Sequence, residues 1–331
     1  QQDIVVGFMT APTLSIAPQM MTFKMGYYDE VGLKVTITPF EGAATLLPQL
    51  AQRHVAFGWL NPDVLMVARQ PGRDVVPIKA YYNGIPLSPY EIVVLEDSPI
   101  ETLTDLKGKN IGVGAMSWGN LASTKAQLRG YDMEFQQDYQ FVPVGTGATA
   151  FRALETGEID ALNLFDTLHT QLELSGIAIR RLQQDEKFLN LFSSSWVTHN
   201  DTLRDDPELV VNFTRATVKG VVACNANPEA CVRNFWELYP NTKPASGTEE
   251  EKMETALAIL KTRLATMIPH GSIAEMGRFK DGSWADYVAV LHEGGQLQSA
   301  DIPVEELYTN DLVDQINDFD VDAVVKAAEA L

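Results

Sequence analysis

Short apolar runs alternate with longer stretches of helical periodicity over the first two thirds of the chain. The apolar runs predict strands at residues 4–8, 34–40, 55–60, 75–82, 91–95, 110–114, 140–144, 159–165 and 177–182. The periodic stretches predict helices at residues 15–29, 44–52, 63–69, 121–129, 148–155 and 167–174. This alternation predicts an α/β fold with mostly parallel sheets flanked by helices.

The pattern changes after Trp196, where strand signals almost vanish. Helical periodicity there predicts helices at residues 207–226, 229–238, 249–267, 284–291 and 321–330. A chain of 331 residues exceeds what one hydrophobic core usually supports, so we expect two lobes. Turn-rich residues 84–89 and extended residues 190–198 are the predicted connections. We expect residues 1–88 plus 197–331 to form the first lobe, and residues 89–196 to form a second lobe inserted through two hinge crossings.

An internal repeat supports two similar lobes. A shift of 104 residues places residues 26–60 on residues 130–164 without a gap. Identical pairs include Gly26 with Gly130, Tyr27 with Tyr131, Ala44 with Ala148, Thr45 with Thr149, Leu50 with Leu154, and Leu60 with Leu164. Chance gives about two identities in such a window at average composition. The repeat predicts one similar unit per lobe with equivalent loops facing each other; coincidence between two generic α/β units is the alternative.

Composition and charge narrow the class of protein. The chain is 45% hydrophobic and 21% charged, as in ordinary globular proteins. Its net charge of −19 disfavours nucleic acid as a partner. No apolar run reaches the ~20 residues that a membrane-spanning helix needs.

The two cysteines and the start of the chain bear on its compartment. Cys224 and Cys231 flank a predicted helix junction at Pro228, and a disulfide there would suit an oxidising compartment. Two free thiols are the alternative, and the surroundings of neither cysteine predict a metal site. A chain that starts at Gln1 without a signal peptide fits a secreted, periplasmic protein whose leader is missing.

Three segments of the sequence resemble a known family. They are residues 25–35 (MGYYDEVGLKV), residues 97–100 with 105–113 (DSPI, DLKGKNIGV), and residues 145–148 with 153–161 (GTGA, ALETGEIDA). Their order and spacing over residues 1–240 resemble periplasmic solute-binding proteins of ABC importers, in the branch of sulfonate, nitrate and thiamine-pyrimidine binders. The resemblance implies a two-lobed type II periplasmic-binding-protein fold with extra C-terminal helices. It also implies a small-molecule ligand, and an ABC permease in the membrane as partner.

Loops beyond the carboxyl ends of parallel strands are the expected binding sites in such sheets. In the first lobe they offer hydroxyls, helix-opening small residues, an aromatic face and an amide. We expect the ligand to contact Thr10, Thr13, Gly42, Ala43, Trp59, Asn61 and Tyr82. The alternatives are loop stabilisation for the threonines, turn packing for the small residues, and core packing for Trp59.

The second lobe offers similar groups. We expect contacts from Ser117, Trp118, Asn120, Thr146, Gly147 and Asp166, with Trp196 at the floor of the cleft. Asp166 could accept hydrogen bonds from an amine or amidine, or simply cap a helix. We expect Trp59→Ala or Asp166→Ala to abolish ligand binding with little change in the melting of the unliganded protein.

The candidate loops contain no lysine or arginine, which favours a neutral or weakly basic ligand such as a pyrimidine-like heterocycle. A binder of alkylsulfonate, nitrate or an aromatic acid is the alternative within the fold. Gly145-x-Gly147-x-x-Ala150 with Asp166 also matches a dinucleotide fingerprint, so an NAD-dependent oxidoreductase is the enzyme alternative. The histidines show no metal-ligand spacing, and no nucleophile motif occurs. We expect a monomer that is not an enzyme, without catalytic residues, metal or cofactor.

Overall fold

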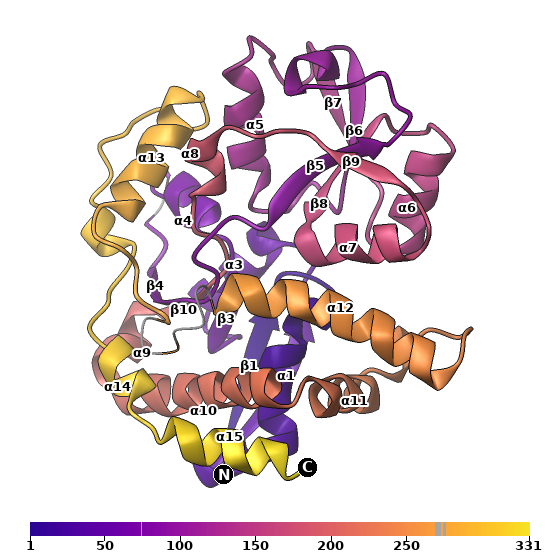
Figure 1. Cartoon of the computed structure of the whole chain (residues 1–331). Helices are drawn as coiled ribbons and strands as arrows, with labels where there is room; N and C mark the ends of the chain where they lie inside the picture. Colours follow the sequence, from indigo (N-terminus) through magenta and orange to yellow (C-terminus); the bar gives the residue numbers. More distant parts are fainter. Residues whose placement is uncertain (74, 269–272, 274–275) are drawn as a thin grey trace.

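The computed structural model describes residues 1–73, 75–268, 273 and 276–331, and its elements form two lobes stacked on one another (Figure 1). The strands are β1 (Gln2–Phe8), β2 (Leu33–Pro39), β3 (Phe57–Leu60), β4 (Ile78–Asn83), β5 (Tyr90–Leu95), β6 (Lys109–Val113), β7 (Tyr139–Pro143), β8 (Ala161–Phe165), β9 (Ile179–Arg181) and β10 (Ser195–His199). The α-helices up to β10 are α1 (Ala17–Met25), α2 (Tyr27–Glu30), α3 (Ala43–Ala51), α4 (Asp63–Ala68), α5 (Leu121–Arg129), α6 (Ala148–Glu155), α7 (Asp166–Leu174) and α8 (Glu186–Leu189). After β10 come α9 (Asn200–Asp205), α10 (Pro207–Ala226), α11 (Pro228–Leu238), α12 (Glu249–Met267), α13 (Ser283–Glu293), α14 (Val313–Asn317) and α15 (Val321–Glu329).

The two sheets have equivalent strand orders. The first runs β2-β1-β3-β10-β4 and the second β7-β6-β8-β5-β9. The pairing directions leave four strands of each sheet pointing the same way, with β10 or β5 as the one antiparallel strand. The prediction of mostly parallel sheets is therefore confirmed. The segments related by the 104-residue shift occupy equivalent places, because β2, α3 and β3 correspond to β7, α6 and β8.

Each antiparallel strand lies next to a connection between the lobes. β5 follows the segment that leaves β4, and β10 follows the segment that leaves β9. Trp196, which the sequence placed at the end of the second lobe, pairs with Trp59 and Tyr82 inside the first sheet. The reason is that β10 starts at Ser195, so the second connection ends before the predicted boundary. The division of the chain at residues 88 and 196 remains a prediction.

Two separate hydrophobic cores underlie the two lobes. One gathers the first sheet with the C-terminal helices, and the other lies around the second sheet. Most predicted elements agree with the structure to within a few residues. The predicted helix over residues 15–29 is the main exception, because Gly26 adopts a left-handed conformation with φ of 71° and separates α1 from α2. Such a conformation ends a helix and suits glycine.

The disulfide prediction is confirmed. Cys224, in the last turn of α10, is bonded to Cys231 in α11. Asn227 and Pro228 lie between them and begin the second helix, with the Asn227 side chain accepting a hydrogen bond from the Ala230 N–H. Both cysteines are buried in the core of the first lobe. The bond therefore fixes the corner between two helices of that lobe.

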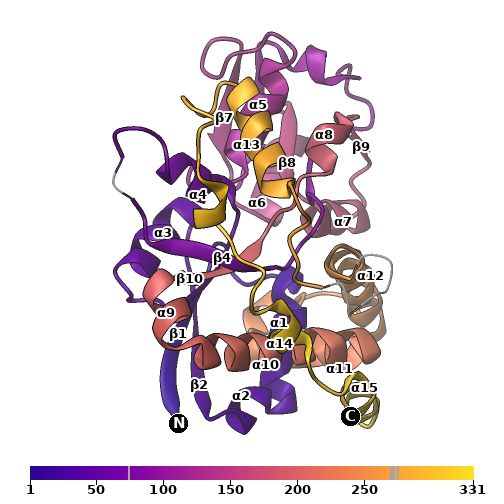
Figure 2. The same cartoon turned by 90° about the vertical axis from the view of Figure 1, so that its left-hand side faces the viewer.

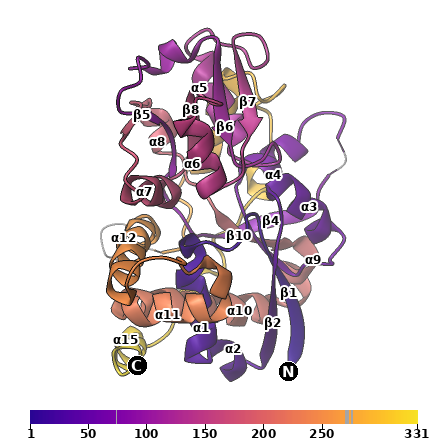
Figure 3. The ribbon, with the colours of Figure 1, turned by 90° about the vertical axis from the view of Figure 1, so that its right-hand side faces the viewer.

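Two C-terminal helices reach from the first lobe to the second. α12 passes beneath α7, and its apolar face belongs to the core of the first lobe (Figures 1 and 3). α13 runs along α5 on another side of the molecule (Figure 2). Gly294, just after α13, approaches Ala126 of α5 so closely that an added Cβ would lie 2.2 Å from the Ala126 Cβ. The helices that follow β10 therefore bracket the boundary between the lobes.

Candidate functional site

A small cavity lies where the two sheets face each other. Its free volume is about 20 Å³, enough for roughly one water molecule. Its walls come from both lobes and from α12. The first lobe contributes the end of β1 with the following turn and the end of β3, and the second lobe contributes the start of β5 and the end of β8. Both connections between the lobes also line the cavity. The lining residues are Met9, Thr10, Ser15, Ile16, Trp59, Ile85, Pro89, Tyr90, Phe165, Ser194 and Arg263.

Aromatic residues of both lobes line the cavity, with Trp59 from the first lobe and Tyr90 and Phe165 from the second. Trp59 packs against Trp196 with ring centres 5.0 Å apart. In the second lobe, Phe165 lies 6.2 Å from Tyr90 edge-to-face and 5.7 Å from Trp118 in a stacked arrangement. Aromatic side chains contributed by both lobes suit a planar ring, because aromatic pairs favour stacked and edge-to-face contacts.

Asn61 links the lobes at the edge of this aromatic wall. It follows β3, is 2% exposed, and its side-chain NH₂ donates to the Ser193 hydroxyl at 3.0 Å. Its side-chain carbonyl accepts a hydrogen bond of 3.1 Å from the Tyr90 hydroxyl of the second lobe. The Asn61 carbonyl thus holds the Tyr90 hydroxyl at the cavity, while the NH₂ group of the same amide is anchored to Ser193.

Arg263 of α12 supplies a cation beside the cavity. It is 3% exposed, and its guanidinium donates to Asp166 Oδ1 at 2.9 Å. The guanidinium carbon lies 5.9 Å from the centre of the Phe165 ring. Since α12 packs on the first lobe and Asp166 begins α7 of the second, this buried ion pair joins the two lobes.

The ion pair is incompletely satisfied. Asp166 Oδ1 also accepts from the Thr167 N–H at 2.7 Å, whereas Asp166 Oδ2 and Arg263 Nε are buried without a hydrogen-bond partner among the described residues. Burial raises the pKa of the Asp166 carboxyl, and the charge of Arg263 offsets part of that rise. Buried polar atoms without partners are uncommon in folded proteins and identify a site where a further group can bind.

Direct contacts between loops show that the lobes are closed on each other. The Ser117 hydroxyl donates to the Glu41 carbonyl at 2.7 Å, and the Ala44 N–H donates to the Ser117 carbonyl at 3.3 Å. An added Cβ on Gly42 would lie 2.4 Å from the Ser117 carbonyl oxygen, and one on Gly119 would lie 2.8 Å from the Asn61 Cβ. Only glycine permits these approaches, so the two small residues let the lobes meet.

A second buried carboxylate lies at the boundary, on α4. Asp63 accepts from the Tyr287 hydroxyl of α13 at 2.5 Å and from the Ser123 N–H of α5 at 3.3 Å. Burial raises the pKa of the Asp63 carboxyl to about 6, although both hydrogen bonds oppose the rise. Asp63 therefore joins the first lobe, the second lobe and the C-terminal segment through one side chain.

The structure brings only part of the predicted site together. Thr10 and Trp59 line the cavity. Asn61, Trp118, Asp166 and Trp196 contact residues that line it. Gly42, Ala43 and Ser117 lie at the closed contact between the lobes, where Ala43 is fully buried.

The remaining predicted residues lie elsewhere. Thr13 caps a 3-10 helix, Leu14–Ile16, with its hydroxyl 2.7 Å from that of Ser15. Tyr82 donates to Asn317 in α14 at 3.0 Å, away from the cavity, because the neighbouring Tyr81 is directed into the core. Asn120 is buried beside Asn163 of β8. Thr146 and Gly147 are half-exposed at the start of α6 and line no described cavity.

Tyr90 and Arg263 are the main residues that the sequence interpretation missed. Tyr90 opens β5, one residue before the predicted start of that strand. Arg263 lies in a helix whose bounds were predicted correctly, and it shares the buried face of that helix with Leu260, Leu264 and Met267. A lone arginine on an apolar helix face was the available signal, because such a charge requires a buried partner. The candidate loops themselves contain no lysine or arginine, and the cation beside the cavity comes from a C-terminal helix instead.

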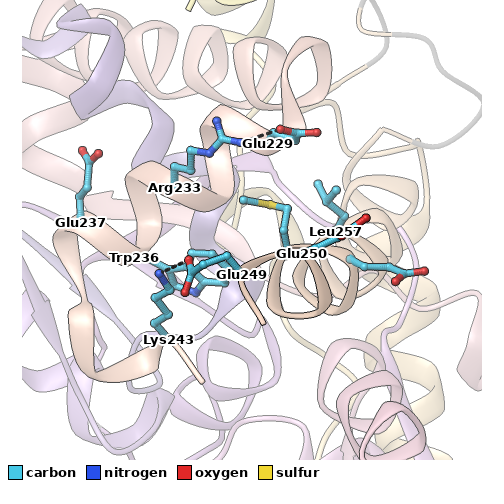
Figure 4. A pocket seen from close by; sticks show the side chains of 10 residues that line it. Glu229, Arg233, Trp236, Glu237, Lys243, Glu249, Glu250 and Leu257 are labelled. Atoms are coloured by element: carbon cyan, nitrogen blue, oxygen red, sulfur yellow. Dashed lines mark hydrogen bonds and ion pairs between the residues drawn. The ribbon is translucent and has the colours of Figure 1, made fainter. Parts of the chain in front are cut away.

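A larger groove of about 890 Å³ lies outside the boundary between the lobes, along α11 and α12 (Figure 4). Two ion pairs lie along its walls, Arg233 with Glu229 at 2.8 Å and Lys243 with Glu249 at 2.6 Å. The Lys243 ammonium also lies 5.2 Å from the centre of the Trp236 ring. Both cationic side chains that line the groove are thus paired with carboxylates.

Two features are absent from the part of the chain that the structure describes. No group of three or more histidine, cysteine, aspartate or glutamate side chains there has an arrangement that could hold a metal ion. None of the helices in the described ranges is both long enough and apolar enough to cross a bilayer.

Known proteins of similar sequence and fold include both binding proteins and an enzyme. The riboflavin-binding protein RibY of Chloroflexus aurantiacus is 22% identical over 317 residues, which cover 94% of this chain and 86% of RibY. The alkanesulfonate-binding protein SsuA from Xanthomonas axonopodis pv. citri, solved with MOPS bound, gives a TM-score of 0.70 at 14% identity, covering 93% of this chain and 99% of SsuA. The desulfurization enzyme DSZB gives a TM-score of 0.59 at 13% identity, covering 96% and 99% of the two chains.

These structures confirm the predicted two-lobed periplasmic-binding-protein fold with additional C-terminal helices. A family model described as NMT1/THI5 like matches residues 14–231, from the first 3-10 helix to the second cysteine of the disulfide. Because that match covers more than half of the sequence, the chain belongs to the NMT1/THI5-like family.

Proposed function

We propose that this chain is an extracytoplasmic solute-binding protein that encloses a small planar molecule between its lobes and delivers it to an ABC importer. The observation that carries the proposal is the cavity between the lobes, with aromatic residues of both lobes in its lining. The closed contacts around Gly42 and Ser117 leave room for roughly one water molecule, so binding requires the lobes to separate and close again.

The relatives support a small-molecule ligand. RibY is named for riboflavin and SsuA for alkanesulfonates. A planar heterocycle fits the aromatic walls of this chain, and Asp166 neutralises the cation that an anionic ligand would need. We therefore favour a pyrimidine-like or flavin-like ring over a sulfonate.

A binding role rather than an enzymatic one has two supports. The disulfide leaves neither cysteine free as a thiol nucleophile. Asp166, the acidic residue of the dinucleotide fingerprint, is engaged by Arg263 and the Thr167 N–H instead of being open to a ribose. We further propose that the protein acts as a monomer and resides in the periplasm, where a disulfide is stable.

A thermal-shift screen tests the proposed function. The panel contains nitrate, alkylsulfonates, pyrimidines, flavins, aromatic acids and NAD(H). We expect a heterocycle held at 100 times its dissociation constant to stabilise the protein by about 2.7 kcal/mol. X-ray scattering profiles with and without that compound should differ, because the closed lobes leave room for roughly one water molecule and must move to admit it. A shift with NAD(H) alone would support the dehydrogenase alternative, and no shift with any solute would contradict the proposal.

A further inference from the structure

The buried pair of Arg263 and Asp166 combines two features that point to a ligand. Arg263 lines the cavity, and Asp166 directly follows Phe165, which also lines it. As whole residues, Arg263 is 3% and Asp166 8% exposed, yet their side chains share one hydrogen bond, of 2.9 Å. The pair therefore stands at the cavity with hydrogen-bonding capacity left over.

The two unpartnered atoms have opposite character. Arg263 Nε carries a hydrogen-bond donor, and Asp166 Oδ2 is an acceptor. Leaving a hydrogen-bonding group buried and unpaired is unfavourable, and more so when the group is charged. A ligand that presents an acceptor next to a donor would satisfy both atoms at once.

The charges of the pair restrict the class of ligand further. A sulfonate or carboxylate could accept from Arg263, but it would bring a second negative charge beside Asp166. An amine or amidine could donate to Asp166, but it would bring a second positive charge beside Arg263. Like charges at such distances in a buried site are strongly unfavourable. A neutral ligand avoids both repulsions.

We infer that Arg263 and Asp166 together recognise the lactam or imide edge of a neutral planar heterocycle, whose ring carbonyl accepts from Arg263 and whose adjacent ring N–H donates to Asp166. This inference rests on the proposed function and identifies its ligand class. The ring of such a ligand would contact the Phe165 face, which lies 5.9 Å from the Arg263 guanidinium carbon. Arg263 lies outside the segment matched by the family model, so this selectivity comes from the C-terminal helices.

Two pairs of probes test the inference on the unaltered protein. Riboflavin is compared with 3-methylriboflavin, and 1-methylthymine with 1,3-dimethylthymine, by calorimetry or fluorescence quenching. Each methyl group replaces the imide N–H and leaves the ring otherwise intact. We expect the methylated member of the bound pair to bind at least about tenfold more weakly, because Asp166 then remains unsatisfied. Octanesulfonate is included as the anionic probe.

Two double variants separate this role from a merely structural one. Asp166→Leu with Arg263→Met removes the recognition pair without leaving a buried charge, a replacement that folded proteins tolerate. We expect this variant to distinguish parent from methylated probe by no more than about twofold. The matched control is Glu229→Leu with Arg233→Met, which removes the exposed ion pair of the outer groove and should retain the tenfold difference.

Several results would overturn the inference while leaving the proposed function intact. These are equal binding of parent and methylated probes, binding of octanesulfonate but of no imide, and a tenfold difference that persists in the Asp166→Leu, Arg263→Met variant. Absence of binding by every probe and every solute of the thermal-shift panel would instead overturn the proposed function, and the inference with it.

Discussion

At the residue scale, Trp59 and Asp166 stabilise the folded protein as well as adjoining the cavity. Trp59 is 5% exposed and contacts Phe8 and Trp196, so its truncation to alanine should cost about 3–5 kcal/mol. Removing the Asp166 carboxylate would leave Arg263 as a buried, unpaired charge at a similar cost. The sequence-based expectation that either alanine variant would leave the unliganded protein unchanged therefore needs revision, and paired replacements are the better test.

Strand direction alone places Thr10 and Trp59 at the same edge of the first sheet, and both residues line the cavity. Their contact with a ligand stays a prediction. The same reasoning could not place Tyr82. The C-terminal segment covers one face of β4, where Tyr82 contacts it, and α10 covers the other face, where Tyr81 contacts it. The local sequence does not show which element covers which face. Contacts between residues distant in sequence decided the outcome.

Asp63 gives a prediction for the dependence of stability on pH. Its pKa is about 6 in the folded protein and 3.8 for the unperturbed group, so the folded state binds the proton more tightly. The free energy of unfolding should rise as the pH falls from about 6 to about 4. Asp63→Asn lacks this contribution. The free energy of unfolding of the unaltered protein, minus that of the variant, should therefore increase by about 3 kcal/mol as the pH falls from about 6 to about 4.

Urea denaturation at pH 7, 5 and 4 measures this difference. Asp132→Asn, at an exposed position of the second lobe, serves as the control for losing one carboxylate. Parallel pH profiles for the unaltered protein and Asp63→Asn would show that burial of Asp63 does not shift its titration.

At the scale of elements, local periodicity predicted nearly every long helix and most strands, because the residues that determine it lie within a few positions of each other. The bounds of α5, α6, α10 and α12 agree with the prediction at every residue. The short helices α8, α9 and α14 were missed, since they contain few apolar residues and too few turns to show a period. Where the helices pack was not predictable, and this is why the place of Arg263 in the site was missed.

The disulfide between α10 and α11 should contribute measurably to stability. It closes a short loop, with a sequence separation of 7 residues. Loop-closure entropy for a loop of this size corresponds to about 2.5 kcal/mol. We expect the double variant Cys224→Ala, Cys231→Ala to lose that amount in the free energy of unfolding, measured by urea denaturation.

Reduction of the unaltered protein with dithiothreitol should give a similar loss, and should leave the double variant unaffected. Equal stability of the oxidised and reduced forms would contradict this prediction.

At the scale of the whole molecule, lobe closure depends on close backbone contact at Gly42. A Cβ at this position would lie 2.4 Å from the Ser117 carbonyl oxygen, which belongs to the backbone and cannot rotate away. Gly42→Ala should therefore hold the lobes apart and weaken ligand binding by at least about tenfold, because binding energy would be spent on closing a strained contact. Calorimetry and small-angle scattering report affinity and closure.

Gly130→Ala is the matched control, because Gly130 is exposed at the end of α5 with a helical φ of −60°. This variant should close and bind as the unaltered protein does. Full affinity together with a compact liganded Gly42→Ala protein would show that closure does not need this contact.

The position of β10 in the first sheet has a consequence for the order in which the chain folds. β10 lies between β3 and β4 and is the only strand paired with β4 in the described sheet, whereas the second sheet is built from the unbroken stretch of chain between β5 and β9. As the polypeptide emerges from a ribosome or a translocation channel, the inserted lobe can complete its sheet first. β4 must wait without a neighbour until residues 195–199 arrive, so the lobe that holds the N-terminus finishes second.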